Sequence, residues 1–135
     1  MTMLGVFTLE SVFRFKIMIS TFFDDLINSV INCFNKYFDF ETRSSRKEFW
    51  YWQLFRILMF LSITFIESLG LNGLLFISNF IFIIPEIAVS IRRLHDINKS
   101  GWWILLTFTI IGIIPLTYFY CIKGDDNNNA YGQPN

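Results

Sequence analysis

The segment Arg92-Arg93-Leu94-His95-Asp96 brings together the side chains of this sequence best suited to chemistry. Asp96 lies four residues after Arg92 and three after Arg93, so on a helix its carboxylate meets either guanidinium. An imidazole such as that of His95 ordinarily changes charge near neutral pH. A general base also needs an oriented substrate and a partner that stabilises the electrophile, and the sequence identifies neither. We therefore favour a structural polar cluster at the end of a helix.

A second polar segment, Ser45-Arg46-Lys47-Glu48, stands directly before an aromatic-rich apolar stretch. Its spacing is that of a capping box, in which the Ser45 hydroxyl accepts from the Glu48 amide and the Glu48 carboxylate accepts from the Ser45 amide. Basic residues at this position are typical of contact with lipid headgroups. Together the two segments predict one boundary feature, the polar cluster, which consists of Arg43, Arg46, Glu48, Arg92, Arg93, His95 and Asp96.

The composition favours a membrane domain over a soluble one. Hydrophobic residues make up 53% of the 135 residues and charged residues 16%, against about 25% charged in soluble domains. The formal net charge is zero, which disfavours a disordered chain and a nucleic-acid binder. Cys33 and Cys121 are far apart, and the single histidine has no cysteine near it. We therefore expect no disulfide framework, no metal site and no cofactor.

Three apolar segments predict an all-α integral membrane protein with three transmembrane helices. Residues 102–122 form 21 residues without a charge, a helix of about 31 Å, close to the hydrocarbon thickness of a bilayer. Residues 49–66 and 74–91 are 18-residue segments with few polar interruptions. A break at Gly112 and Pro115 leaves open a re-entrant hairpin in the last segment. The three spans define a membrane domain over residues 41–135 with a short polar tail.

The distribution of basic residues sets the expected orientation. Nine lysines and arginines fall on the side that holds the segment before residue 49 and the 92–99 connection, and only Lys123 falls on the other side. By the positive-inside rule the first side is cytoplasmic, so we expect a cytoplasmic N-terminus and an outside C-terminus. The tryptophans lie at the same boundary, as expected of an interfacial belt formed by Trp50, Trp52, Trp102 and Trp103.

The N-terminal part differs from the three spans. Residues 18–40 place aromatic and aliphatic side chains, Phe22 to Tyr37, on one helical face and polar ones on the other. This pattern predicts an amphipathic helix that lies along the membrane surface or packs against the bundle. Residues 1–17 fit neither description, and Met18 is a candidate natural start that would make them an extension.

Arg56 and Glu86 are charges inside the first two spans, where unpaired charges are costly. They are equidistant from residue 71 in the short turn between antiparallel helices. Both should therefore lie about 8–10 Å below the same surface. The spacing predicts that they face each other as an intramembrane ion pair, with Gln53 one turn away. The alternative is that Arg56 extends alone to the surface and Glu86 is protonated.

Three sequence blocks resemble the domain-of-unknown-function family 805, small YhaH-like bacterial inner-membrane proteins. These blocks are FDFETRSSRKEFWYW, IPEIAVSIRRLHDINKSGWW and KGDDNNNAYGQP, over roughly residues 34–134. The chain departs from the family pattern at Thr42 and Asn127, and Glu86 is not a position associated with the family. The resemblance implies an inner-membrane protein without a known cofactor, and it supplies no reaction. The recurring positions it carries over include Arg43, Arg46, Glu48, Pro85, Arg92, Arg93, His95, Asp96, Gly101, Gly124, Asn129, Tyr131, Gly132 and Pro134.

Three functions are compatible with these features. The favoured one is a non-enzymatic protein whose polar cluster binds lipid headgroups or an acidic segment of a membrane or cytoplasmic protein partner, because arginine forks suit such anions. An alternative is an oligomeric channel or transporter subunit that uses Arg56 and Glu86. Another is a membrane enzyme that acts on a lipid substrate through His95 and Asp96.

Overall fold

The computed structural model describes residues 3–134, with side chains described from Leu9 to Pro134. The predicted extension therefore lies partly outside the described residues. Over the described residues, the chain is helical apart from its connections, its tail and one isolated bridge between Asn129 and Gly132. The elements are α1 (Met3–Asn35), α2 (Arg46–Ser68), α3 (Leu74–Asp96), a 3-10 helix η1 (Gly101–Phe108) and α4 (Ile113–Cys121).

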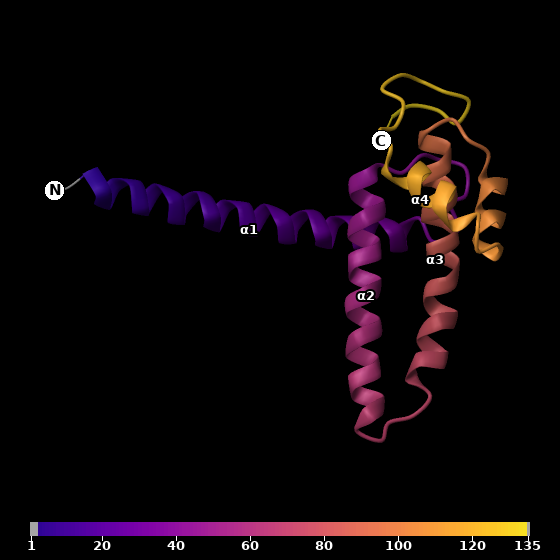
Figure 1. Ribbon diagram of the computed structural model, residues 1–135, viewed down its shortest axis with the longest axis horizontal. Helices are drawn as coiled ribbons and strands as arrows, with labels where there is room; N and C mark the ends of the chain where they lie inside the picture. The colour runs from indigo at the N-terminus through magenta and orange to yellow at the C-terminus, as the bar shows by residue number, and fades with distance from the viewer. Residues whose placement is uncertain (1–2, 135) are drawn as a thin grey trace.

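Helices α2 and α3 form a long antiparallel hairpin (Figure 1). Ser45 caps the start of α2, since its side chain accepts from the Glu48 amide. The turn at the far end contains Gly70 and Gly73 with φ of 101° and 98°, a region that side chains other than glycine rarely enter. The Glu67 carboxylate accepts from the Leu75 amide at 2.8 Å and so closes the turn.

Three described helices are long and apolar enough to cross a membrane, over Leu9–Asn35, Arg46–Ser68 and Leu74–Asp96. The prediction of an all-α membrane protein with three such helices is confirmed. The third of them, however, is α1 and not the segment over residues 102–122. Outside the packed end of the molecule, α2 and α3 expose large apolar side chains such as Leu61, Phe65 and Phe76, a surface suited to hydrocarbon and not to water.

Helix α1 is one continuous helix through Met18 and runs crosswise to α2 and α3 (Figure 1). If α2 and α3 cross the bilayer, α1 lies along its surface, as an interfacial helix does. Its C-terminal part also packs against the hairpin. Phe34 contacts Trp52 edge to face with ring centroids 5.4 Å apart, and Phe22 contacts Tyr51 in the same way at 5.4 Å. The predicted packing against the bundle is therefore observed, while the interfacial position and the start site at Met18 stay predictions.

The prediction of a continuous helix over residues 102–122 is wrong. The segment divides into η1 and the nine-residue α4, with Thr109 in extended conformation between them. A Cβ on Gly112 would lie 2.3 Å from Thr109 Oγ1 and 2.5 Å from the Leu106 carbonyl oxygen, so only glycine fits this bend. Pro115 stands in the first turn of α4, where its missing N–H costs no helical hydrogen bond. The segment has the bent shape expected of the re-entrant hairpin that the sequence left open, and the name re-entrant hairpin is used for it below.

The C-terminal tail lies at the same end of the molecule as the start of α2 and the end of α3 (Figure 1). The Asp125 amide donates to the Asp96 carbonyl at 2.8 Å. The prediction that the tail lies on the opposite side from the 92–99 connection is therefore wrong, because α4 returns the chain to its starting side. With Lys123 at this end, Arg56 in the middle of α2 is the basic residue of the α2–α3 hairpin that lies away from it, and the other basic residues lie on or directly after α1 or at the tail end.

The core lies at this end of the molecule. One cluster packs Cys33 of α1 against Phe49 and Trp52 of α2 and Val89 of α3. A second cluster joins α3 to α4 and consists of Leu94, Ile97 and Leu116. All four α-helices thus meet where the polar cluster lies.

Candidate functional site

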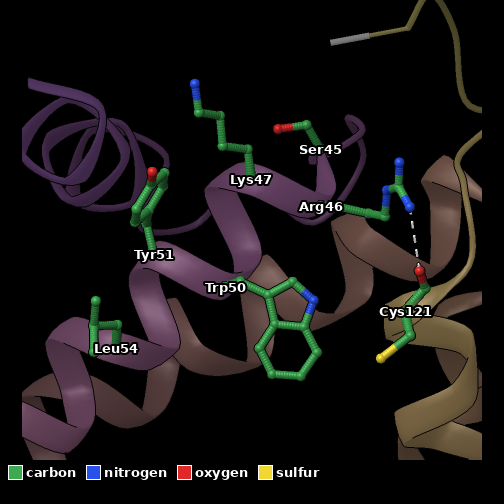
Figure 2. Close-up of a pocket in the computed structure, with 7 residues that line it drawn as sticks. All are labelled: Ser45, Arg46, Lys47, Trp50, Tyr51, Leu54 and Cys121. Carbon is green, nitrogen blue, oxygen red and sulfur yellow. Dashed lines mark hydrogen bonds between the residues drawn. The ribbon is translucent and has the colours of Figure 1, made fainter. Parts of the chain in front are cut away.

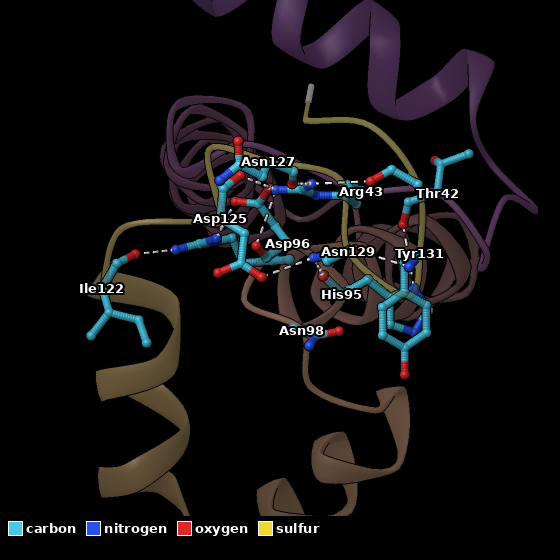
Figure 3. Close-up of polar contacts among 12 residues, drawn as sticks. Thr42, Arg43, His95, Asp96, Asn98, Ile122, Asp125, Asn127, Asn129 and Tyr131 are labelled. Atoms are coloured by element: carbon cyan, nitrogen blue, oxygen red, sulfur yellow. Dashed lines mark hydrogen bonds and ion pairs between the residues drawn. The ribbon is translucent and has the colours of Figure 1, made fainter.

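Arg43 is buried beneath the tail and contacts Asp96 (Figure 3). Its Nε and Nη2 donate to Asp96 Oδ1 at 3.1 and 2.9 Å. Its remaining donors reach tail carbonyls: Nη1 donates to Asn127 at 2.9 Å and to Gly132 at 3.2 Å, and Nη2 donates to Asp125. One side chain from the connection before α2 therefore holds both the end of α3 and the tail.

Arg93 occupies the other oxygen of the same carboxylate. Its Nη1 lies 2.6 Å from Asp96 Oδ2, and its other nitrogens donate to the carbonyls of Tyr120 and Ile122. The sequence allowed Asp96 to pair with either arginine of α3, and the structure selects Arg93. The Asp96 carboxylate is satisfied by the two guanidinium groups, and the remaining donors of Arg93 bind carbonyls at the end of α4, which ties the re-entrant hairpin to α3.

Arg92 points the opposite way, toward α1 and α2. Its Nη1 donates to Glu48 Oε1 at 2.9 Å, and both side chains are buried. The thiol of Cys33 lies 3.7 Å from the same oxygen. The Ser44 amide donates to the Arg92 carbonyl at 3.0 Å. This second ion pair joins three helices at one point inside the core.

His95 is held between the tail and the connection before α2. Its ring stacks on Tyr131 with centroids 3.7 Å apart and planes within 5°. Its Nδ1 lies 3.3 Å from the carbonyl oxygens of both Glu41 and Thr42. Because both neighbours are acceptors, Nδ1 carries a proton and donates. The ring therefore holds two backbone segments together.

The tail makes contacts that residue spacing did not predict. Asn129 donates to the His95 carbonyl at 2.9 Å. A Cβ on Gly124 would lie 1.9 Å from Asp96 Oδ2, so a glycine is needed where the tail crosses the carboxylate. The signal for these residues was the family resemblance, which carried over Gly124, Asn129 and Tyr131.

The structure brings six of the seven members of the polar cluster into buried positions, and Arg46 is the exception. The donors of Arg43 and Arg93 point inward, to one carboxylate and to backbone carbonyls. Arg46 faces outward and donates a single long hydrogen bond to the Cys121 carbonyl at 3.4 Å. The buried members therefore stabilise the fold, and Arg46 remains accessible to an anion.

Arg46 lies at the edge of an open groove along α2, here called the α2 groove (Figure 2). Its volume is about 720 Å³. Lys47 stands beside Arg46 and forms an exposed ion pair with Asp25 of α1 at 2.5 Å. The walls carry two aromatic rings and an aliphatic side chain. The groove is lined by Ser45, Arg46, Lys47, Trp50, Tyr51, Leu54 and Cys121.

Arg56 and Glu86 lie together between α2 and α3. Arg56 Nη1 is 3.5 Å from Glu86 Oε2, the facing arrangement that the spacing predicts. Gln53 donates to Glu86 Oε1 at 2.6 Å, and the Trp52 indole donates to Oε2 at 2.9 Å. Glu86 is thus held by three side chains of α2.

The tryptophan belt needs one correction. Trp50, Trp102 and Trp103 are exposed at the end that holds the polar cluster, as an interfacial belt requires. Trp52 is fully buried, because its indole N–H is used by Glu86 and its ring packs in the core. In the part of the chain that the structure describes, no three His, Cys, Asp or Glu side chains are grouped as metal ligands.

Fold and site define a small all-helical membrane protein: an apolar hairpin, a crosswise N-terminal helix and a re-entrant segment closed by an arginine-held tail. The chain belongs to the family described as Protein of unknown function (DUF805), which matches residues 37–133. It is 36% identical over 106 residues to the inner membrane protein YhaI of Escherichia coli K12, covering 76% of this chain and 90% of that protein. It is 32% identical over 104 residues to YhaH of the same strain, covering 71% and 86%. No solved structure matches the chain.

Proposed function

We propose that this protein is a bacterial inner-membrane protein that acts by binding, and that the α2 groove holds the phosphate-bearing headgroup of an anionic lipid. The observation that carries the proposal is the position of Arg46. It is the outward-facing arginine of the polar cluster, and its one hydrogen bond is long. A planar guanidinium with free donors suits phosphate oxygens.

The rest of the groove fits a lipid. Trp50 and Tyr51 offer amphipathic rings one turn along α2 from Arg46, the residue types that accumulate at the level of headgroups. Leu54 continues the wall toward the apolar part of the hairpin. A lipid whose headgroup binds Arg46 would therefore place its acyl chains along the apolar surface of the α2–α3 hairpin.

The charge distribution supports a cytoplasmic position for this end of the molecule. The basic residues outside α1 and Arg56 gather there, which is the cytoplasmic arrangement under the positive-inside rule. We infer that both the start of α2 and the tail face the cytoplasm, where anionic lipid headgroups would meet Arg46 and Lys47.

The surroundings of His95 favour binding over catalysis. One ring nitrogen is engaged by backbone carbonyls, and one ring face is covered by Tyr131. Asp96 uses both carboxylate oxygens for arginines. Neither group is presented to a substrate as an acid or base would need to be. The pairing of Arg56 with Glu86 within one chain likewise gives no support to a charged pathway.

The test measures phosphatidylglycerol binding by native mass spectrometry of the purified full-length protein, with phosphatidylcholine as the neutral comparison. Arg46→Gln should weaken phosphatidylglycerol binding by about tenfold, the loss of one charge-assisted contact, and leave phosphatidylcholine binding unchanged. Lys99→Gln is the matched control, since Lys99 is exposed at the same end but outside the groove.

Equal phosphatidylglycerol binding by Arg46→Gln and Lys99→Gln would overturn the proposal. If Arg46→Gln instead removes a protein that copurifies from native membranes, the groove binds an acidic protein segment and not a lipid. Trp50→Leu provides a second variant, which should weaken binding of both lipids because it removes wall area and no charge.

A further inference from the structure

A separate apolar cavity lies between α3 and the re-entrant hairpin. Its volume is about 560 Å³, within the range of roughly 300–1,000 Å³ for ligand pockets. One face of α3 supplies Ile83, Glu86, Ile87 and Ser90, and α4 supplies Leu116 and Tyr120. The break of residues 102–122 creates this cavity, because a straight helix would leave no concave side toward α3.

The cavity has one polar end, at Glu86. A carboxylate offers about four acceptor positions. Trp52 and Arg56 approach Oε2, and Gln53 donates to Oε1. An acceptor position on Oε1 is therefore left for a further donor. The Glu86 side chain is 27% exposed, and it lines the cavity.

The charge at this end is already balanced. Glu86 is paired with Arg56, and an additional charge inside an apolar membrane site would be unpaired and costly. A ligand that fits must therefore donate a hydrogen bond without carrying a charge. The side chains of Ser90 and Tyr120 also line the cavity, and they hydrogen-bond to each other, so the Glu86 carboxylate is the acceptor on which the proposal rests.

We propose that this cavity binds a neutral lipid alcohol, a long hydrocarbon chain that ends in a hydroxyl group. The hydroxyl donates to Glu86 Oε1, and the chain lies along Ile83, Ile87 and Leu116. Ile83 of α3 and Phe108 of η1 both line the cavity, and both are exposed on the surface of the molecule. The ligand therefore enters from the hydrocarbon region. The site is independent of the α2 groove and does not rest on its function.

The test is photocrosslinking of the full-length protein in phosphatidylcholine nanodiscs. The probe is a fatty alcohol with a diazirine in its chain, and the comparison probe is the corresponding alkane without the hydroxyl. The alcohol should label peptides from residues 83–90 and 104–120, and unlabelled fatty alcohol should compete. We expect the alcohol to label these peptides about tenfold more than the alkane, as a hydrogen bond to a carboxylate would give.

Two variants fill the cavity, Ile83→Trp from α3 and Thr107→Trp from η1. Each should remove the alcohol labelling. The matched control is Ile57→Trp, since Ile57 and Ile83 are 56% and 52% exposed and Ile57 is not part of the cavity wall. The double variant Arg56→Gln, Glu86→Gln keeps the site neutral and should reduce the preference for alcohol over alkane without removing alkane labelling.

Equal labelling by alcohol and alkane would overturn the assignment, because the cavity would then hold any hydrocarbon chain. Labelling that persists in a correctly inserted Ile83→Trp or Thr107→Trp protein would also overturn it. The two variants alter different helices, so a folding failure in one leaves the other to decide.

Discussion

Asp96 accepts two hydrogen bonds from Arg43, which lies 53 residues earlier in the chain. The contact joins the connection before α2 to the last residue of α3, inside the layer that the tail covers. Since both side chains are buried, the pair is shielded from solvent and salt, and its loss leaves uncompensated charge. Its position makes it the point at which hairpin, re-entrant segment and tail are joined.

Removal of the Asp96 charge should strongly destabilise the protein. Asp96→Asn leaves Arg43 and Arg93 buried without their carboxylate, and we expect a loss of about 3–5 kcal/mol in the free energy of unfolding. The control is Asp126→Asn, which breaks the exposed Lys123–Asp126 pair and should cost less than about 1 kcal/mol. Unfolding in mixed micelles, followed by circular dichroism, measures both. Similar losses in the two variants would contradict the buried pair.

Gly124 should not tolerate a side chain. A Cβ there would lie 1.9 Å from Asp96 Oδ2, so Gly124→Ala must displace the tail or the carboxylate, at a cost of about 1–3 kcal/mol. Limited proteolysis of the tail reports the displacement. Asn128→Ala, at an exposed position of the same tail, should leave the cleavage rate unchanged, and equal cleavage of Gly124→Ala and the unaltered protein would refute the close approach.

The two cysteines should differ in reactivity. Cys33 is fully buried beside Glu48 and Arg92, and Cys121 is exposed. A maleimide should therefore label one thiol per folded chain and two after unfolding, as mass spectrometry will show. Arg92→Gln, which leaves Glu48 without this ion pair, should expose Cys33 and give two labels without denaturant. A single label on Arg92→Gln would show that the ion pair does not hold α1 in place.

The two ends of the chain should lie on the same side of the membrane. The tail is tied to the end of α3 and to Arg43, which precedes α2. Reporters fused in turn to each terminus should therefore both be active on one side only. Opposite responses would show that a third segment crosses the membrane, either α1 or residues 102–122, and a reporter inserted before Arg43 would then decide which of the two it is.

The connection before α2 should lose stability in acid through Asp39. Partial burial raises the pKa of the Asp39 carboxyl, but hydrogen bonds from Thr42 and from the Glu41 amide outweigh this and hold the pKa below its usual value. Because the folded pKa is the lower one, the stabilisation is present above the unfolded value of about 3.9 and is lost as the pH falls through the folded value. Unfolding at graded pH should show this loss in the unaltered protein and less of it in Asp39→Asn. An equal acid dependence in both would assign the loss to other carboxylates.

The sequence by itself determined the membrane class, the family, the α2–α3 hairpin and the facing of Arg56 and Glu86. These follow from local patterns: apolar length, the Ser45 cap, the turn glycines and the equal distance of two charges from one turn. Periodicity also marked the amphipathic face of α1, although not its continuity through Met18.

Only the tertiary structure decided that residues 102–122 bend, that Asp96 takes Arg93 and Arg43, that Trp52 is buried and that Arg46 faces outward. The apolar length of residues 102–122 predicts a straight helix, because it contains no information on the close approach of Gly112 to Thr109 and Leu106 at the bend. The contacts of the tail join residues far apart in the chain, such as Asn129 and His95, which are 34 positions apart, and they follow no helical or strand period. The direction in which each arginine side chain points depends on which carboxylate and carbonyl groups lie within its reach. The positions of those groups depend in turn on how α1, α4 and the tail pack around α3.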